Sequence, residues 1–349
     1  MRKIRLKIKG FLAAGAVLCL LGGCGKDTPT DYQLGKESLE KGNYTEAIEY
    51  FQGAVEADDH TLESWRGIGI SWTEQGVFDK AQEAFETAAE FAEKSSRAMQ
   101  TDIFLYLVDA KYQQGDYEGC IETCTELLKR QRVKDAYFLR GSAYLYQDEY
   151  KKAADNFAKV ISGSEDYADY LDIYRVYLAC DMNADGEEYL ESALEITAKD
   201  PEDYYNKGRI YYYLEEYENA QKELEKALEE EYAQAAVYLG KVYMASGDTE
   251  NAEKMFQQCL KEDGLKAEGY NGLAYCAAQA QDYDSALEYI AKGLEEKDGR
   301  TEQALLFNEI VLYEKKSDYN SAKQKMSEYL EMYPADESAV RENYFLQTR

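Results

Sequence analysis

The sequence predicts an all-α protein, a right-handed α-solenoid of about nine helical hairpins followed by one C-terminal capping helix. Three observations support this prediction. One motif returns about every 34 residues along most of the chain. Apolar residues make up 45% of the 349 residues and proline occurs three times, a composition that favours helix. No alternating stretch long enough for a strand stands out, so one helix–turn–helix unit is expected to stack repeatedly.

Each unit carries a small residue in its second helix, and six of the nine units carry another about twelve positions earlier, in the first helix. In the third, fifth and ninth units Val108, Tyr174 and Ile310 replace the first-helix small residue. The first-helix positions hold Gly35, Gly69, Val108, Gly141, Tyr174, Gly208, Gly240, Ala274 and Ile310. The second-helix positions hold Ala47, Ala81, Cys120, Ala153, Gly186, Ala220, Ala252, Ala286 and Ala322. Small residues at both places let the two helices approach closely, because no bulky side chain separates their backbones.

This pattern resembles the tetratricopeptide repeat, and the resemblance covers roughly residues 31–334. In that family proline closes each unit, and here only Pro334 stands at that place. The resemblance implies a concave surface, lined by first helices, that holds peptide segments. The final segment, 335–349, contains an amphipathic stretch up to Leu346 and is expected to cover the last apolar face as a capping helix.

Residues 1–23 have the parts of an export signal, with a basic start, an apolar stretch from Phe11 to Leu21, and small residues. The apolar stretch of about 11 residues is too short for a bilayer, which needs about 20. Its end, Leu21-Gly22-Gly23-Cys24, resembles the lipobox of bacterial lipoproteins. That resemblance implies that Cys24 becomes the lipid-bearing N-terminus, with 24–30 as a tether. An ordinary secretory signal with an incidental cysteine is the alternative.

The charge and the residue inventory exclude several function classes. The net charge of −28 repels phosphate backbones, so no nucleic-acid partner is expected. The sequence has one histidine, His60, which rules out Ser-His-Asp triads and histidine metal clusters. It also lacks a glycine-rich phosphate-binding motif. We therefore expect no enzyme and no cofactor.

Five cysteines follow Cys24, an odd number that cannot pair completely. Cys120 and Cys124 stand four apart on one helix face, where other repeats carry alanine and phenylalanine. We interpret them as small core residues. A metal or redox pair is the alternative.

Three cations, Arg175, Arg209 and Lys241, occupy one equivalent first-helix position in adjacent repeats. The flanking aromatic residues are Tyr205, Tyr212 and Tyr213. In an acidic chain these residues could form a groove for an acidic segment or a terminal carboxylate. The alternative is that each cation pairs with a neighbouring Asp or Glu.

The segment from Asp181 through Asn183 and Asp185 to Gly186 matches the opening of a calcium loop. Residue Ser192 stands where the closing glutamate belongs, and the same residue types suit any tight turn. Calcium binding is therefore a hypothesis beside an ordinary turn.

Together these features predict a lipid-anchored, extracytoplasmic scaffold that binds a protein or peptide and organises a bacterial envelope complex. The alternative function is a receptor that captures peptides or solutes in the concave groove. The acidic charge and the leader disfavour a cytoplasmic regulator, which would need a DNA-binding module.

Overall fold

The computed structural model describes residues 28–334 and 336–349, and these residues form helices joined by turns, with no strand among them. The described helices make nine hairpins and one final helix, which confirms the predicted all-α repeat architecture. Helix contacts divide the chain after Ser164 into two compact units. We call them the N-terminal unit, residues 28–164, and the C-terminal unit, residues 165–349.

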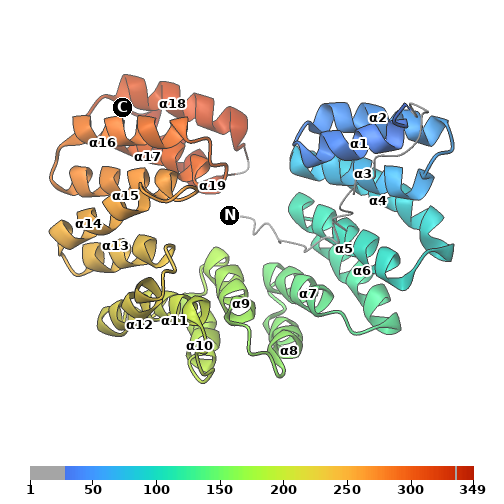
Figure 1. Ribbon diagram of the computed structural model, residues 1–349, viewed down its shortest axis with the longest axis horizontal. Coiled ribbons are helices and arrows are strands. Elements are labelled where there is room, and N and C mark those ends of the chain that lie inside the picture. The colour runs from blue at the N-terminus through green and yellow to red at the C-terminus, as the bar shows by residue number, and fades with distance from the viewer. Residues whose placement is uncertain (1–27, 335) are drawn as a thin grey trace, which may run out of the picture. The chain divides into compact units, whose positions relative to one another are not determined.

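The N-terminal unit holds four hairpins, drawn from blue to green in Figure 1. Its helices are α1 (Asp31–Glu40), α2 (Tyr44–Glu56), α3 (Thr61–Glu74), α4 (Phe78–Phe91), η1 (Ala92–Lys94), α5 (Arg97–Gln114), α6 (Tyr117–Arg130), α7 (Lys134–Tyr146) and α8 (Tyr150–Ile161). Within this unit α2, α4 and α6 also pack against the first helix of the next hairpin, so the four hairpins stack in sequence order.

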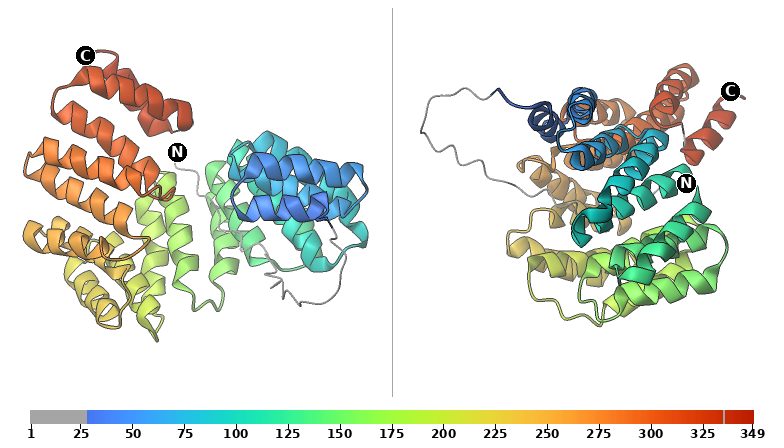
Figure 2. Two further views of the ribbon diagram at one scale, coloured as in Figure 1. Left: turned by 45° about the horizontal axis from the view of Figure 1, so that its top comes forward. Right: turned by 90° about the vertical axis from the view of Figure 1, so that its right-hand side faces the viewer.

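The C-terminal unit holds five hairpins and the final helix. Its helices are α9 (Tyr167–Ala179), α10 (Asn183–Ala193), α11 (Pro201–Tyr213), α12 (Tyr217–Glu229), α13 (Ala235–Ala245), α14 (Thr249–Cys259), α15 (Lys266–Gln279), α16 (Tyr283–Glu295), α17 (Glu302–Lys315), α18 (Tyr319–Met332) and α19 (Glu337–Leu346). Figure 2 shows from two further sides that the two helices of a hairpin lie next to each other.

The turn inside each hairpin is closed by local chemistry. One residue per described turn has a left-handed backbone, and these residues are Gly42, Gly76, Gly115, Asp148, Asp181, Glu215, Gly247, Gln281 and Ser317. Glycine adopts this conformation without steric penalty, and other residues do so at a modest cost. Several second helices then begin at an aspartate whose side chain accepts a backbone N–H from three residues ahead, at 2.9–3.2 Å. These caps start at Asp116, Asp248, Asp282 and Asp318.

Close helix approach depends on the predicted first-helix glycines. A β-carbon built on Gly35, Gly69, Gly141, Gly208 or Gly240 would lie 2.5–2.8 Å from the residue 16 positions later. Those facing residues are Phe51, Phe85, Phe157, Leu224 and Phe256, all of them buried. The second-helix side chain therefore lies against bare backbone of the first helix, which explains the glycine in these repeats.

The final helix α19 closes the C-terminal unit in the manner expected of a capping helix. Ala339 and Leu346 are fully buried against α17 and α18, in a cluster that includes Ile310 and Met326. Polar residues at this junction are also paired, since the Tyr329 hydroxyl donates to an Asp336 carboxylate oxygen at 2.6 Å.

Candidate functional site

The three predicted cations lie on neighbouring first helices of the C-terminal unit. Arg175 is on α9, Arg209 on α11 and Lys241 on α13, each directly after the small-residue position of its repeat. Helix α11 packs against both α9 and α13, and α13 packs against α15. Equivalent residues of successive hairpins therefore lie on a common face, which we call the first-helix face.

Arg175 matches the alternative in which a cation pairs with a neighbouring acid. Its guanidinium forms an ion pair with Asp172 at 2.6 Å within the same helix. Burial raises the pKa of Asp172, while Arg175 and then Arg209 oppose that effect. This arginine is therefore partly neutralised by its own helix.

Arg209 has a different environment. Its guanidinium carbon lies 5.2 Å from the ring centre of Tyr205 and 5.3 Å from that of Tyr238. One terminal nitrogen donates to the Asn206 side-chain oxygen at 2.9 Å, and Nε has no hydrogen-bond partner among the described residues. No carboxylate within the described ranges forms an ion pair with this guanidinium. Aromatic faces, rather than an acid, thus hold the charge.

Lys241 lies beside the same ring. Its Nζ is 4.4 Å from the ring centre of Tyr238. The Tyr238 hydroxyl lies 2.9 Å from that of Tyr213. Burial alone would raise the pKa of Tyr238, but the charges of Arg209 and Lys241 favour the phenolate and lower it to about 8.

A groove with a volume of about 520 Å³ opens beside this cluster. It is lined by Tyr212, Tyr213, Val237, Lys241, Met244, Ala245, Phe256, Glu268, Asn271, Gly272, Tyr275 and Asn308. Tyr275, at its rim, is 54% exposed and stands in α15 at the register position of Lys241. Asn308 donates to the Asn271 side-chain oxygen at 2.8 Å, so α17 and α15 are joined across the groove.

The groove contains one acid. Glu268 approaches Arg300 at 3.6 Å through one oxygen, and its other oxygen is buried without a hydrogen-bond partner among the described residues. Burial raises the pKa of Glu268, while Arg300 and Lys241 act in the opposite direction. This oxygen is thus a buried acceptor that the described residues leave unsatisfied.

Sequence reasoning located most of this cluster and missed Tyr238. The structure brings Arg209, Lys241, Tyr205 and Tyr213 together around the Tyr238 ring. In register, that ring stands where α9 and α11 carry Asp172 and Asn206, each of which contacts a cation of its own helix. Aligning that position would have revealed the tyrosine.

The tyrosine run at the end of α11 is partly covered by its neighbours. Tyr211, Tyr212 and Tyr213 are all half-buried. Tyr211 packs on the core of its own hairpin, whereas Tyr212 and Tyr213 line the groove. The neighbouring first helix α13 covers rings that an isolated helix would expose.

The segment that matches the opening of a calcium loop does not form a long loop in the structure. Asp181 has a left-handed backbone and α10 begins at Asn183, so Asp185 already lies in the first helical turn. A calcium loop needs about twelve residues that wrap around the ion. In the ranges that the structure describes, no three His, Cys, Asp or Glu side chains gather as a metal site. The segment forms the hairpin turn between α9 and α10, and calcium binding stays a prediction.

Two further sequence interpretations concern cysteine and the leader. Cys120 and Cys124 are fully buried and free, as expected of core residues. A hydrogen bond involving Cys124, together with burial, raises the pKa of the Cys120 thiol, which makes it less reactive. Cys24 lies outside the described residues. Among the described helices, none has the length and apolar character needed to cross a bilayer.

Comparison with known proteins gives a family match. A model described as tetratricopeptide repeat matches residues 32–96, 105–168 and 239–301, more than half of the chain, and a second of the same description matches 204–234. No curated protein matches the sequence.

Solved structures with similar repeats cover different shares of the chain. The crystal structure of MamA is 21% identical with a TM-score of 0.39, covering 46% of this chain and 93% of that one. A tetratricopeptide repeat protein from Parabacteroides merdae is 13% identical with a TM-score of 0.46, covering 68% and 94%. A chain of the APC/C hetero-tetramer Cut9-Hcn1 is 13% identical with a TM-score of 0.42, covering 91% and 76%.

Proposed function

Because this chain belongs to the tetratricopeptide repeat family, we propose that it is a non-catalytic scaffold that captures a protein partner outside the bacterial cytoplasm. Proteins of this family bind other proteins or peptides and are typically non-catalytic. The proposal adds a place, a membrane anchor and a binding surface to that general role.

The proposed anchor is a lipid on Cys24. The support is the leader itself, with its basic start, short apolar stretch and lipobox-like residues before the cysteine. Acylation at the N-terminus would hold the repeats near the membrane surface, since two or more chains give stable attachment. Such an anchor would place the repeats outside the cytoplasm. The proposed role in assembling an envelope complex rests on analogy with other lipid-anchored proteins of this repeat family.

The proposed partner site is the groove on the first-helix face of the C-terminal unit. One observation carries it: Arg209 and Lys241 converge on Tyr238 with no carboxylate paired to either of them in the described ranges. The chain has a net charge of −28, yet these two cations lie against one aromatic ring at the wall of a groove. An acidic segment of the partner would supply the missing carboxylates through charge-assisted hydrogen bonds.

The test is capture of the partner in intact cells by crosslinking and pull-down. The variant Arg209→Gln with Lys241→Gln is expected to lose the partner, because neither glutamine attracts a carboxylate. The matched control is Lys254→Gln, which removes an exposed cation paired with Glu250 at 2.8 Å on α14. Undiminished capture by the double variant would overturn the proposed site.

A receptor for small peptides or solutes is the second candidate. The groove volume of about 520 Å³ falls in the range of small-ligand sites, and its wall combines aromatic rings with two amides and one acid. Native mass spectrometry of gently purified protein distinguishes the two functions. A co-purifying small molecule that the Tyr275→Ala variant no longer retains would favour the receptor, whereas a stoichiometric protein favours the scaffold.

A further inference from the structure

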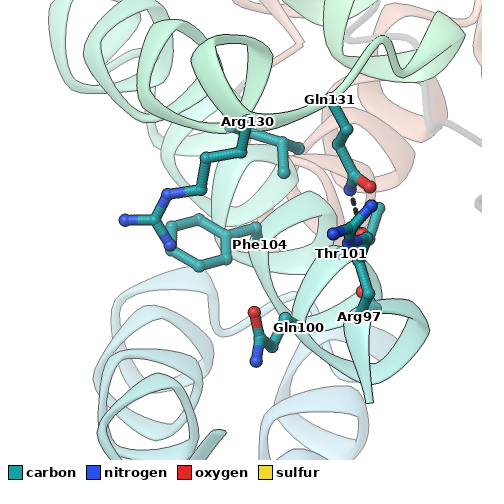
Figure 3. A pocket seen from close by; sticks show the side chains of 7 residues that line it. Arg97, Gln100, Thr101, Phe104, Arg130 and Gln131 are labelled. Carbon is teal, nitrogen blue, oxygen red and sulfur yellow. Dashed lines mark hydrogen bonds between the residues drawn. The ribbon is translucent and has the colours of Figure 1, made fainter. Parts of the chain in front are cut away.

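A second cavity lies in the N-terminal unit, in the α5–α6 hairpin, at the end where α5 starts and α6 finishes. Its volume is about 300 Å³, and it does not involve the groove described above. The lining residues are Arg97, Gln100, Thr101, Phe104, Leu127, Arg130 and Gln131. Figure 3 shows the guanidinium of Arg130 beside the Phe104 ring, and Arg97 next to Thr101 and Gln131. We call this cavity the α5–α6 pocket.

The walls of the pocket are fixed by hydrogen bonds. The Gln131 amide donates to the Thr101 hydroxyl, which ties the end of α6 to α5 (Figure 3). The Gln100 amide donates to the backbone oxygens of Ala92 and Ser95, at 3.0 Å and 3.2 Å. This links α5 to the chain around η1. Both amide walls are thus set before any ligand arrives, which lowers the entropic cost of binding.

The floor of the pocket is apolar. Leu127 is 4% exposed and Phe104 is half-buried, so both side chains are held by packing. The pocket therefore combines a small hydrophobic floor with two guanidinium groups in its lining. A volume of about 300 Å³ lies at the lower end of ligand sites, a size that suits a few side chains of a peptide.

The charge of the pocket is opposite to that of the chain. Arg130 pairs with Glu126 at 3.0 Å, and Lys129 pairs with the same carboxylate at 3.1 Å. Arg97 is exposed, and no ion pair joins it to an acid in the described ranges. Arg132 follows in the adjoining exposed loop. The single carboxylate of Glu126 thus pairs with two cations, and at least one further cation lies nearby.

We propose that the α5–α6 pocket binds an acidic peptide segment of a protein partner, with an apolar side chain on Phe104 and carboxylates on Arg97 and Arg130. The lining joins an apolar floor to two arginines, which matches a segment that carries acids close to an apolar residue. Guanidinium forks bind carboxylates through paired, charge-assisted hydrogen bonds. This second site lies outside the C-terminal unit and does not depend on the proposed groove.

The experiment measures binding of a synthetic peptide, two glutamates flanking one phenylalanine with blocked ends, to the full chain by calorimetry. We expect binding that weakens at high salt and becomes at least about tenfold weaker in the double variant Arg97→Gln with Arg130→Gln. Arg97 and Arg130 are both exposed, so the variant should melt like the wild type. The Arg209→Gln and Lys241→Gln double variant should retain the affinity attributed to the pocket.

Three results would overturn the proposal. Peptide affinity that is equal in the pocket variant and the wild type would place the binding elsewhere. Equal binding of a peptide with glutamines in place of glutamates would show that the arginines do not recognise the carboxylates of the peptide. Binding of glycerol phosphate or inorganic phosphate without binding of the peptide would assign the pocket to phosphate groups. Loss of peptide binding in the groove variant alone would be a fourth contradicting result, because it would place the peptide in the C-terminal unit and not in the pocket.

Discussion

The ring of Phe85 occupies the space that a side chain on Gly69 would need, since a β-carbon on Gly69 would lie 2.5 Å from the ring. The same relation joins Gly35 to Phe51 and Gly240 to Phe256. Each pair spans the two helices of one hairpin. The width of these hairpins is therefore set by an aromatic ring that rests on glycine backbone.

This relation predicts the effect of the smallest possible enlargement. Gly69→Ala should lower the free energy of unfolding by about 1–3 kcal/mol, because the methyl group and the Phe85 ring compete for one volume. Another repeat suggests the compensation, since Ala274 stands where Gly69 does and faces the buried Ile290. Adding Phe85→Ile to Gly69→Ala should therefore restore part of the loss in a denaturant titration. A double variant less stable than Gly69→Ala would contradict this reading.

The sequence predicted these contacts where glycine recurs, but one compensation could not be read from it. In the fifth hairpin the first-helix position carries Tyr174, and the second-helix marker is Gly186 rather than alanine. A β-carbon on Gly186 would lie 3.0 Å from the Tyr174 ring and 2.8 Å from the Tyr177 β-carbon. In this hairpin the large side chain stands on α9 and the glycine on α10. Only the packing shows that these two changes compensate each other.

The candidate site shows a similar limit. Register placed Arg175, Arg209 and Lys241 in one row, but it could not tell which of them would be paired. Asp172 lies three residues before Arg175, one helical turn away, and neutralises it. Asn206 and Tyr238 take the corresponding places before Arg209 and Lys241, so these two keep their charge for other groups.

The first pH prediction concerns Tyr238. Its pKa of about 8 lies below the ordinary value of 10.0, because Arg209 and Lys241 stabilise the phenolate. An absorbance titration should show one tyrosine ionising near pH 8, and Tyr238→Phe should remove that step. The folded protein releases this proton before the unfolded chain does, so stability relative to Tyr238→Phe should rise between about pH 8 and 10. No ionisation below pH 9 would contradict the assignment.

The second pH prediction concerns the capping helix. Burial and then the neighbouring Glu342 raise the pKa of Glu314 to about 7, above its ordinary value of 4.5. The folded protein therefore holds a proton that the unfolded chain has released, and this contribution to stability is lost as the pH rises from about 4.5 to 7. Glu314→Gln should flatten that part of the pH profile and raise the melting temperature at pH 8. The exposed Glu331→Gln, as control, should follow the wild type, and an identical flattening there would refute the assignment.

The anchor prediction concerns the leader. Cys24→Ala should release the protein from the membrane fraction and abolish the acyl mass on its N-terminal peptide, because the thiol is the proposed attachment point. Cys19→Ala changes the other leader cysteine and should leave both properties intact. Membrane association that persists in Cys24→Ala, without acyl mass in the wild type, would reject lipidation.

The most direct test of the scaffold proposal is photo-crosslinking in living cells from the rim of the groove. A benzoylphenylalanine at Tyr275, 54% exposed beside Lys241, is compared with one at Tyr344, 73% exposed on α19. The account predicts one discrete protein adduct from position 275, absent from position 344 and lost when Arg209 and Lys241 are both glutamine. Adducts of equal yield and identity from both positions, or adducts that survive the loss of both cations, would contradict it.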